Sequence, residues 1–210
     1  MALTYGMRIG WKRGQPEFYG TIGGFASNLE DQTAVYLLTC GHVVTNTVGQ
    51  RIYVFPKGAR VGTYIGDVTE TTPSGNNDAN NPKLLDAALV RIEYPSLWKI
   101  DYKFNGTALH GTEDAKLGQE VTMIGAKSGK TELLVIEVTD YRTSGYSVKN
   151  LVHPGDSGSL VISREMPPTA VGLVYAGTPE GLVYSCNIDR IFTFFSGFRL
   201  KISPTSLAIG

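Results

Sequence analysis

The feature that most constrains the fold is a succession of short segments rich in Val, Ile, Tyr and Thr, most of them separated by clusters of Gly, Asn, Pro or Asp. Such segments, bounded by turn residues, are typical of β-strands. No amphipathic helix long enough to connect parallel strands lies between them, which excludes repeated βαβ units. We therefore predict an all-β protein, a barrel or a sandwich. The expected strands are YGTIGGFAS, TAVYLLTC, QRIYVFP, RVGTYIG, AALVRIEY, EVTMIGA, TELLVIEVT, SLVIS, TAVGLVYAG and LVYSCNI.

The length of 210 residues fits one large domain or two small units. A pair of barrels, hinged between Tyr102 and Gly111, explains this length. We expect a single domain over residues 1–210, with its halves at about 20–105 and 112–195. A surface loop is expected over the polar stretch from Thr71 to Pro82, and a short helical turn from Ile188 to Phe195, where apolar residues recur at near-helical spacing.

The charge balance excludes some classes of partner. Lys and Arg number 19, as do Asp and Glu, so no basic field would attract nucleic acid or an anionic membrane. No run of about 18 apolar residues is present, so we expect no membrane span.

The ends and the cysteines bear on location. Residues 1–18 contain no apolar run followed by a small-residue cleavage site, so we do not expect a signal peptide. Cys40 and Cys186 are the only cysteines, too few for a disulfide framework. A reducing, intracellular (cytoplasmic) compartment is therefore expected, unless the chain is a segment cut from a larger polypeptide.

Two candidate catalytic residues lie at the ends of apolar runs. His42 follows YLLTCG and precedes more apolar residues, which predicts a partly buried imidazole at a strand end, although a purely structural histidine would look the same. Asp86 lies among Leu85, Ala87 and Ala88, and a buried carboxylate is costly unless it is paired. We expect a partner for Asp86, and the ring N–H of a neutral imidazole would serve.

The third candidate lies in the stretch HPGDSGSL, from His153 to Leu160. A serine hydroxyl needs an adjacent base to become a nucleophile, and the oxyanion it creates needs fixed donors. Gly155 lets the backbone turn its N–H groups toward one point, and Gly158 removes a side chain that would crowd the approach. The pattern predicts that Ser157 is presented together with an N–H pair.

Together these features are more specific than any one alone. His42, Asp86 and Ser157 occur in the chain order of one well-known catalytic triad and not in the orders of its two counterparts on other folds. The segments TCGHVV, LDAALVRI, PGDSGSLVI and AVGLVYAG resemble those of the chymotrypsin-fold, or trypsin-like, serine peptidases over nearly the whole chain. The resemblance implies two packed six-stranded antiparallel β-barrels, with the active site in the cleft between them.

The same resemblance implies the role of each residue. His42 would be the general base and then the general acid, Asp86 would hold its tautomer and stabilise the imidazolium, and Ser157 would be the nucleophile. The backbone N–H groups of Gly155 and Ser157 would form the oxyanion hole. The stretch from Gly172 to Gly177 resembles the strand along which the substrate backbone is added.

Two departures from the secreted members of this superfamily stand out. The stretch TIGGFA lies inside the chain, where those members begin, so Asp156 would lack the terminal ammonium that activates them. Their disulfide beside the histidine is also absent, and we expect Cys40 and Cys186 to be free thiols. The chain therefore resembles bacterial, viral and fungal members more than secreted digestive ones.

The resemblance also implies a primary specificity pocket. No acid stands at its base, where Leu151 falls, so Lys and Arg are disfavoured. We expect preference for an apolar or aromatic side chain, whereas His153 could instead favour an acidic one. The expected lining is Leu151, Val152 and His153 on one wall, Tyr175, Ala176 and Gly177 on another, and Leu182 to Tyr184 at the back.

Other motifs carry no chemistry in this interpretation. GAKSGKT, residues 125–131, resembles a phosphate-binding loop but has three residues between its glycines instead of four and opens onto a strand, so we expect a β-turn. His110 is expected to be exposed. Three histidines and two scattered cysteines show no metal-ligand spacing, so neither a metal nor another cofactor is expected.

The sequence thus predicts a serine endopeptidase that cleaves polypeptides through an acyl-enzyme. Two alternatives stay open: a non-catalytic barrel that binds peptide or protein partners with a remnant site, and a self-processing peptidase domain of a larger protein.

Overall fold

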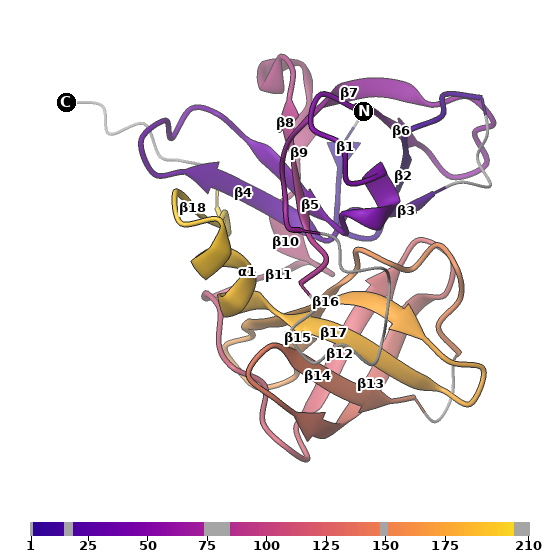
Figure 1. The fold of residues 1–210 in the computed structure, drawn as a ribbon, viewed down its shortest axis with the longest axis vertical. Coiled ribbons are helices and arrows are strands. Elements are labelled where there is room, and N and C mark those ends of the chain that lie inside the picture. The colour runs from indigo at the N-terminus through magenta and orange to yellow at the C-terminus, as the bar shows by residue number, and fades with distance from the viewer. Residues whose placement is uncertain (1, 15–18, 74–84, 148–150, 204–210) are drawn as a thin grey trace.

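The computed structural model describes residues 2–14, 19–73, 85–147 and 151–203, and within these ranges the protein is built almost entirely of strands. The strands form two bodies that lie one above the other in Figure 1. The N-terminal half of the chain forms one and most of the C-terminal half forms the other. The all-β, two-barrel architecture predicted from the sequence is confirmed.

The C-terminal body is a closed barrel of six antiparallel strands. Its hydrogen-bonded order is β12 (Glu120–Gly125), β13 (Gly129–Val138), β14 (Arg142–Tyr146), β17 (Leu182–Asn187), β16 (Ala170–Gly177) and β15 (Leu160–Ser163). Burial alternates along β13, where Thr131, Leu133 and Val135 point inward, because successive side chains of a strand face opposite sides. Leu133 and Val135 join a small hydrophobic core inside the barrel.

The N-terminal body is a sheet of eight strands that curls on itself (Figure 1). Its order is β18 (Phe198–Leu200), β4 (Gly24–Asn28), β5 (Tyr36–Thr39), β8 (Ala88–Ile92), β7 (Thr63–Thr71), β6 (Arg51–Phe55), β2 (Arg8–Gly10) and β3 (Gly20–Thr21). Strand β3, at one edge, runs through Ile22 and Gly23 directly into β4, next to the other edge. The chain itself therefore bridges the gap that hydrogen bonds leave between the two edges.

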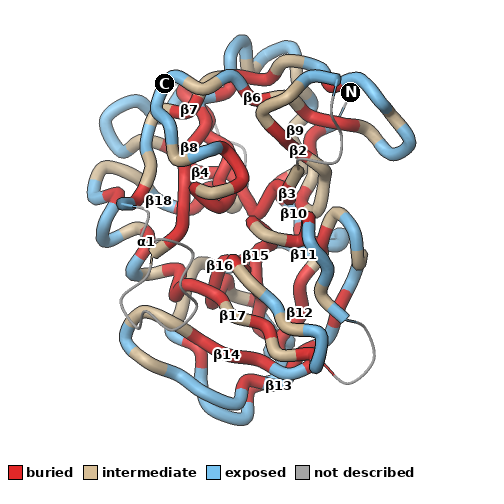
Figure 2. Tube along the Cα trace, turned by 45° about the vertical axis from the view of Figure 1, so that its right-hand side comes forward, coloured by how far each residue is buried: buried red, intermediate tan, exposed pale blue. Residues whose placement is uncertain are grey.

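The two bodies share one hydrophobic core. The cluster that fills the N-terminal sheet also contains Leu160, Leu173 and Cys186 from the C-terminal barrel, and Figure 2 shows buried chain continuing from one body into the other. The helix α1 (Ile188–Phe194) leads from β17 to β18, which pairs with β4. The end of the chain thus returns to the N-terminal sheet.

All ten expected strands are present, and the expected helical turn is α1. The shorter elements were not predicted. Strand β14 was missed because its sequence, RTSGY, is polar, and its pairing with β13 and β17 makes it a strand. The other elements that were not predicted are β2 and β18, the parallel pair β1 (Ala2–Leu3) and β9 (Lys99–Ile100), the hairpin of β10 (Lys103–Phe104) and β11 (Thr107–Ala108), and the 3₁₀ turns η1 (His42–Val44) and η2 (Pro95–Leu97).

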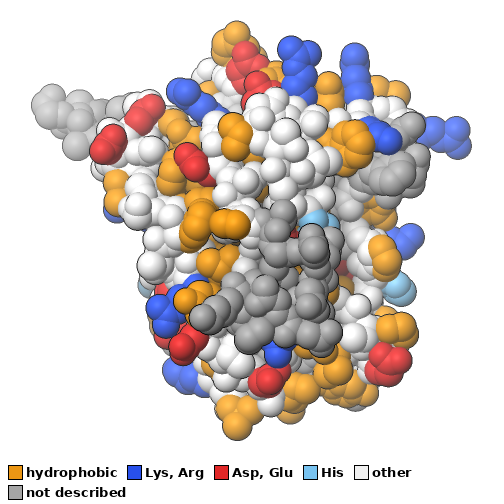
Figure 3. Space-filling view, viewed as in Figure 1, with side chains coloured by type: hydrophobic (Ala, Val, Ile, Leu, Met, Phe, Trp, Pro, Cys, Tyr) orange, Lys and Arg blue, Asp and Glu red, His pale blue; other side chains and the backbone are white. Residues whose placement is uncertain are grey.

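Two sequence expectations concern loops and the surface. Most of the loop expected over Thr71 to Pro82 lies outside the described residues. In the described part of the chain, no helix has both the length and the apolar character needed to cross a membrane. Basic and acidic side chains are interspersed on the face shown in Figure 3.

Candidate active site

His42 is placed by the bend that ends β5. The strand stops at Thr39, and the 3₁₀ turn η1 begins at His42. Gly41 makes this bend possible, because a Cβ there would lie 2.0 Å from Asn46 Oδ1 and 3.0 Å from Asp86 Oδ1. The two valines that follow His42 are buried, which leaves the imidazole at the surface end of the turn with 25% of its side chain exposed.

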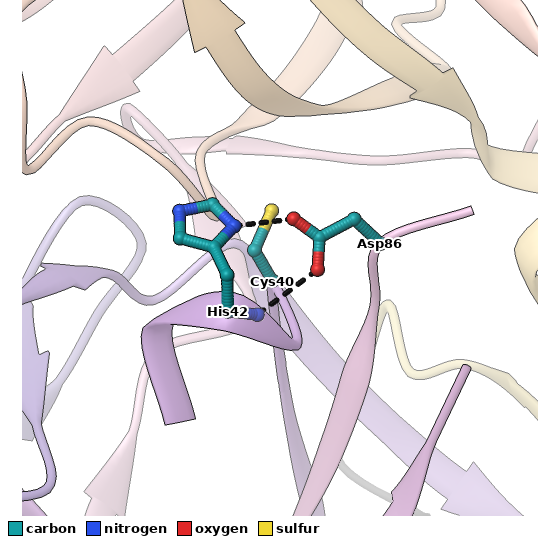
Figure 4. A group of neighbouring side chains, drawn as sticks. All are labelled: Cys40, His42 and Asp86. Atoms are coloured by element: carbon teal, nitrogen blue, oxygen red, sulfur yellow. Dashed lines mark hydrogen bonds and ion pairs between the residues drawn. The ribbon is translucent and has the colours of Figure 1, made fainter. Parts of the chain in front are cut away.

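Asp86, two residues before β8, binds His42 through both carboxylate oxygens. Oδ1 accepts the backbone N–H of His42 at 3.0 Å, and Oδ2 forms a hydrogen bond with the ring Nδ1 (Figure 4). The Asp86 side chain is only 4% exposed, so these bonds replace the solvation that burial removes. The partner expected for this buried acid is therefore His42.

The two cysteines lie on either side of this pair. The backbone N–H of Asp86 donates to Cys186 Sγ at 3.3 Å, and the Cys40 thiol donates to the carbonyl of Val174 at 3.0 Å. Both are buried and free, as expected. Burial raises the pKa of Cys186 to about 12, and burial together with the nearby Asp86 charge raises the pKa of Cys40 well above its usual value. Both sulfurs therefore carry protons at neutral pH.

Ser157 lies in the tight turn that leads into β15, and its hydroxyl donates to the carbonyl of Tyr175 on β16 at 3.3 Å. Within the described residues, no hydrogen bond joins it to His42. The turn nevertheless lies against the end of β5, because a Cβ on Gly158 would lie 2.4 Å from Thr39 Oγ1 and 3.3 Å from Cys40 N. The structure thus brings His42 and Asp86 into contact and places the Ser157 turn alongside them.

The same turn presents two backbone amides. Gly155 has a φ of +107°, which a side chain would disfavour, and a Cβ there would lie 2.4 Å from the Tyr19 ring. The N–H groups of Gly155 and Ser157 donate to no acceptor among the described residues, whereas the intervening N–H of Asp156 donates to His153 O at 3.0 Å. Two unbonded N–H groups beside a serine hydroxyl can bind a developing oxyanion.

Asp156, next to the serine, is fully buried and is held by a neighbouring hairpin. Its Oδ1 accepts the backbone N–H groups of Lys127 at 2.9 Å and Ser128 at 3.0 Å. Its Oδ2 accepts the His153 N–H at 2.8 Å and the Ser128 hydroxyl. The hairpin joins β12 to β13, so the β-turn expected for GAKSGKT is confirmed. Three of the four donors to the Asp156 carboxylate therefore come from this hairpin.

Thr21 ties the serine turn to the N-terminal sheet. It is fully buried on β3, and its N–H donates to Ser157 O at 2.8 Å. Its hydroxyl donates to Gly155 O at 2.8 Å and accepts the N–H of Ala126 at 3.0 Å. One side chain thus connects both bodies at the turn that carries the two amides.

The residues expected to line a specificity pocket differ in exposure. Leu151, His153 and Gly177 are exposed, and Val152, Ala176, Leu182 and Tyr184 are half-buried. The Tyr175 side chain is packed in the core, so only its backbone faces Ser157. His110 is exposed in its loop, as expected.

The two expected walls of that pocket meet. A Cβ on Gly177 would lie 3.3 Å from both Cβ and Cγ1 of Val152, so Val152 is within van der Waals range of the Gly177 backbone. The two expected walls are therefore adjacent at Val152 and Gly177.

A separate hollow of about 480 Å³ lies on the N-terminal sheet. Its lining includes Tyr64, Asp67, Arg91 and Glu93 and none of the candidate catalytic residues. Burial and hydrogen bonds to the two acids raise the pKa of Tyr64. The hollow is therefore a surface feature with mixed polar and apolar lining, separate from the His42–Asp86 pair.

The two-barrel fold is shared with solved structures of chymotrypsin-fold serine proteases. The solved structure of Thermobifida fusca protease A is similar at a TM-score of 0.70 and 18% identity, covering 97% of this chain and 100% of that one. The Nocardiopsis protease structure is similar at a TM-score of 0.70 and 18% sequence identity, and the match covers 96% of this chain and 100% of that one. A third similar structure is that of a glutamic acid-specific serine protease that uses a histidine triad in substrate binding. Its TM-score is 0.66 at 17% sequence identity, and the match covers 95% of this chain and 100% of that one. No family model and no curated protein matches the chain.

Sequence reasoning missed Thr21 and Ser128. Thr21 lies in an apolar strand and Ser128 in a turn, and neither position carries a motif of its own. The available signal was Asp156, because a buried acid between glycines requires several donors. Which donors serve it depends on the fold, since Ser128 is far from Asp156 in the chain. Thr21, equally far away, binds the carbonyls of Gly155 and Ser157 on either side of Asp156.

Proposed function

We propose that this protein is a serine endopeptidase that hydrolyses peptide bonds through an acyl-enzyme, with His42, Asp86 and Ser157 as the catalytic triad. The observation that carries the proposal is the His42–Asp86 pair beside a turn that offers one hydroxyl and two unbonded amides. The serine proteases that share the fold support it.

In the first step, Ser157 Oγ attacks the carbonyl carbon of the scissile bond while His42 Nε2 takes the hydroxyl proton. The Nδ1–H of the imidazolium stays bonded to Asp86, whose buried carboxylate stabilises the positive charge. His42 then gives the proton to the leaving amine, and the acyl group remains on Ser157. Water, activated by His42 in the same way, releases the acid and restores the serine.

This mechanism requires the Ser157 hydroxyl to leave the Tyr175 carbonyl. Their bond is long, at 3.3 Å, and a rotation about χ1 of the serine moves only the hydroxyl. Catalytic hydrogen bonds are often loose in the absence of substrate and tighten when it binds. A substrate carbonyl above Ser157 would also place its oxygen near the amides of Gly155 and Ser157.

The edge of β16 gives the substrate backbone a place to bind. β15 pairs with β16 only as far as Leu173, whereas β17 pairs with it as far as Gly177. The stretch from Tyr175 to Gly177 therefore has one side without a strand partner, next to Ser157. An extended peptide can add there as a further strand, which would lay its scissile bond across the catalytic turn.

Labelling with a fluorophosphonate probe tests the proposal. The wild-type protein should react and the Ser157→Ala variant should not, and peptide mapping should place the label on Ser157. Ser159→Ala is a useful contrast, because Ser159 is fully buried and its hydroxyl donates to Asp156 O. Absence of labelling and of casein hydrolysis, with peptide binding retained, would replace the proposal with a binding role.

A further inference from the structure

The cluster around Asp86 contains a third potential ligand besides the catalytic pair. Cys40 Sγ, the ring nitrogen of His42 and a carboxylate oxygen of Asp86 lie within 4.8 Å of one another. Figure 4 shows the sulfur beside the line that joins the imidazole to the carboxylate. The sequence spacing gave no sign of such a group, because Asp86 comes from another strand.

We propose that Cys40, His42 and Asp86 form a binding site for a thiolate-seeking divalent cation such as Zn²⁺ or Cd²⁺, and that a cation bound there blocks catalysis. The second half of this proposal rests on the proposed function. Sulfur and imidazole together select cations of this kind over Mg²⁺ and Ca²⁺, which prefer oxygen ligands.

The charges of the three groups suit a buried dication. One thiolate and one carboxylate neutralise two positive charges, and the imidazole adds a neutral ligand. This matters because Cys40 and Asp86 are both buried, and an unbalanced buried charge is costly. Three protein ligands with an open fourth position are a common zinc arrangement.

The distances call for a small adjustment. Zinc holds sulfur at about 2.3 Å and nitrogen or oxygen at about 2.0–2.2 Å, so its ligand atoms lie about 3–4 Å apart. Cys40 Sγ would have to approach by about 1 Å, and the His42–Asp86 hydrogen bond would have to open. The imidazole is partly exposed on a three-residue turn, whereas the other two ligands are buried, so entry should be slow.

The proton balance explains why the cation blocks catalysis. The Cys40 thiol loses its proton to solvent when sulfur binds the metal. Nδ1 of His42 must also be free of its proton, which moves to Nε2 in the other neutral tautomer. Nε2 then carries a hydrogen and cannot accept one from Ser157. One proton is released for each cation bound, and the base is inactivated while the metal stays.

Loss of the Cys40 thiol should leave the rest of the site in place. The Val174 carbonyl that accepts from Cys40 also accepts the N–H of Gly158 at 2.7 Å, so it stays paired in a Cys40→Ala variant. Cys40→Ser keeps both the size and the donor but not the thiolate. Cys186→Ala is the matched control, since Cys186 is the other buried thiol beside Asp86 but does not belong to the cluster.

The experiment has two parts, each after prolonged incubation with metal. In the first, Zn²⁺ should abolish fluorophosphonate labelling of the wild type and a chelator should restore it. In Cys40→Ala and Cys40→Ser, the Zn²⁺ concentration that abolishes labelling should be at least about 10-fold higher than in the wild type. Cys186→Ala should stay as sensitive to Zn²⁺ as the wild type. Mg²⁺ and Ca²⁺ should have no effect.

The second part does not depend on activity. Co²⁺ added to the Ser157→Ala protein should give a sulfur-to-cobalt charge-transfer band that disappears with Cys40→Ser. Absence of that band, or equal Zn²⁺ sensitivity of the wild type and both Cys40 variants, would overturn the metal site. Absence of labelling in metal-free wild-type protein would instead count against the proposed peptidase, and the cobalt band would still decide the site.

Discussion

At the scale of single residues, the His42–Asp86 pair is the centre of the account. The Asp86 carboxylate is buried, and both of its oxygens form hydrogen bonds with His42, one with the backbone N–H and one with the ring. The first bond fixes the position of the His42 backbone, and the second fixes which ring nitrogen carries the proton. Nε2 is thereby left as the acceptor that a serine nucleophile needs.

Replacing Asp86 with Asn should lower kcat for a peptide substrate by about 10³–10⁴-fold at neutral pH, because an amide N–H favours the wrong imidazole tautomer. Steady-state kinetics measure the effect. Asp140→Asn is the control, since Asp140 is exposed and its backbone carbonyl accepts the hydrogen bonds from Asn187 and Arg190. Similar losses in both variants would remove Asp86 from the mechanism.

Val152 lies against the Gly177 backbone, so we expect its side chain to limit the size of the substrate side chain that the predicted apolar pocket accepts. Val152→Gly should raise kcat/KM for substrates with Phe or Tyr by about 10-fold or more relative to Ala substrates, because one or two methyl groups in a pocket are worth about 1–3 kcal/mol.

A library of peptides that differ at this one position measures that ratio. Leu151→Ala, on the same loop but exposed, should leave the preference unchanged. A wild-type protein that prefers aromatic residues would contradict the limit on side-chain size expected at Val152.

At the scale of elements, the hairpin between β12 and β13 holds the Ser157 turn in shape. It supplies two N–H groups and one hydroxyl to Asp156, and Thr21 fixes the carbonyls on either side of that residue. The two amides of the turn are therefore set by groups that fold with the barrels. We expect activity without any processing of the chain.

Ser128→Ala removes one of these bonds and should lower kcat by about 10-fold with little change in KM, since a lost bond to a buried charge costs about 1–3 kcal/mol. Labelling rate and kcat should fall together. Lys127→Ala is the control, because Lys127 contributes only its backbone N–H to Asp156. A change confined to thermal stability would mean that Ser128 has a structural role alone.

Much of this could be predicted from the sequence, for physical reasons. Strands with strong apolar alternation and the buried acid at Asp86 can be recognised from the local sequence, because burial dictates residue type. Strand β14 and the hydrogen bonds from the hairpin to Asp156 cannot, since they join residues far apart in the chain. The contact between Val152 and Gly177 could not be predicted either, because side-chain type alone does not give the distance between two segments of the chain.

At the scale of the whole molecule, the two bodies are held together by a shared core and by the last strand. β18 adds to the N-terminal sheet after the chain has completed the C-terminal barrel, and the Phe198 ring lies edge-on to Tyr36 at 4.8 Å. Since His42 and Asp86 come from one body and Ser157 from the other, this tie also bears on catalysis.

Phe198→Ala should lower the free energy of unfolding by about 1–2 kcal/mol, because the ring is half-buried and loses one aromatic contact. Denaturant unfolding measures the change. Phe194→Ala is the control, as Phe194 is more exposed. An unchanged unfolding midpoint for Phe198→Ala would show that β18 does not hold the two bodies together.

The most direct test of the central claim is a crystal structure of the protein after reaction with a fluorophosphonate. The account predicts a covalent bond to Ser157 Oγ, with the phosphoryl oxygen within hydrogen-bond distance of the Gly155 and Ser157 amides and His42 still bonded to Asp86. An adduct on another residue, or a His42 ring out of reach of the Ser157 oxygen in the adduct, would contradict it.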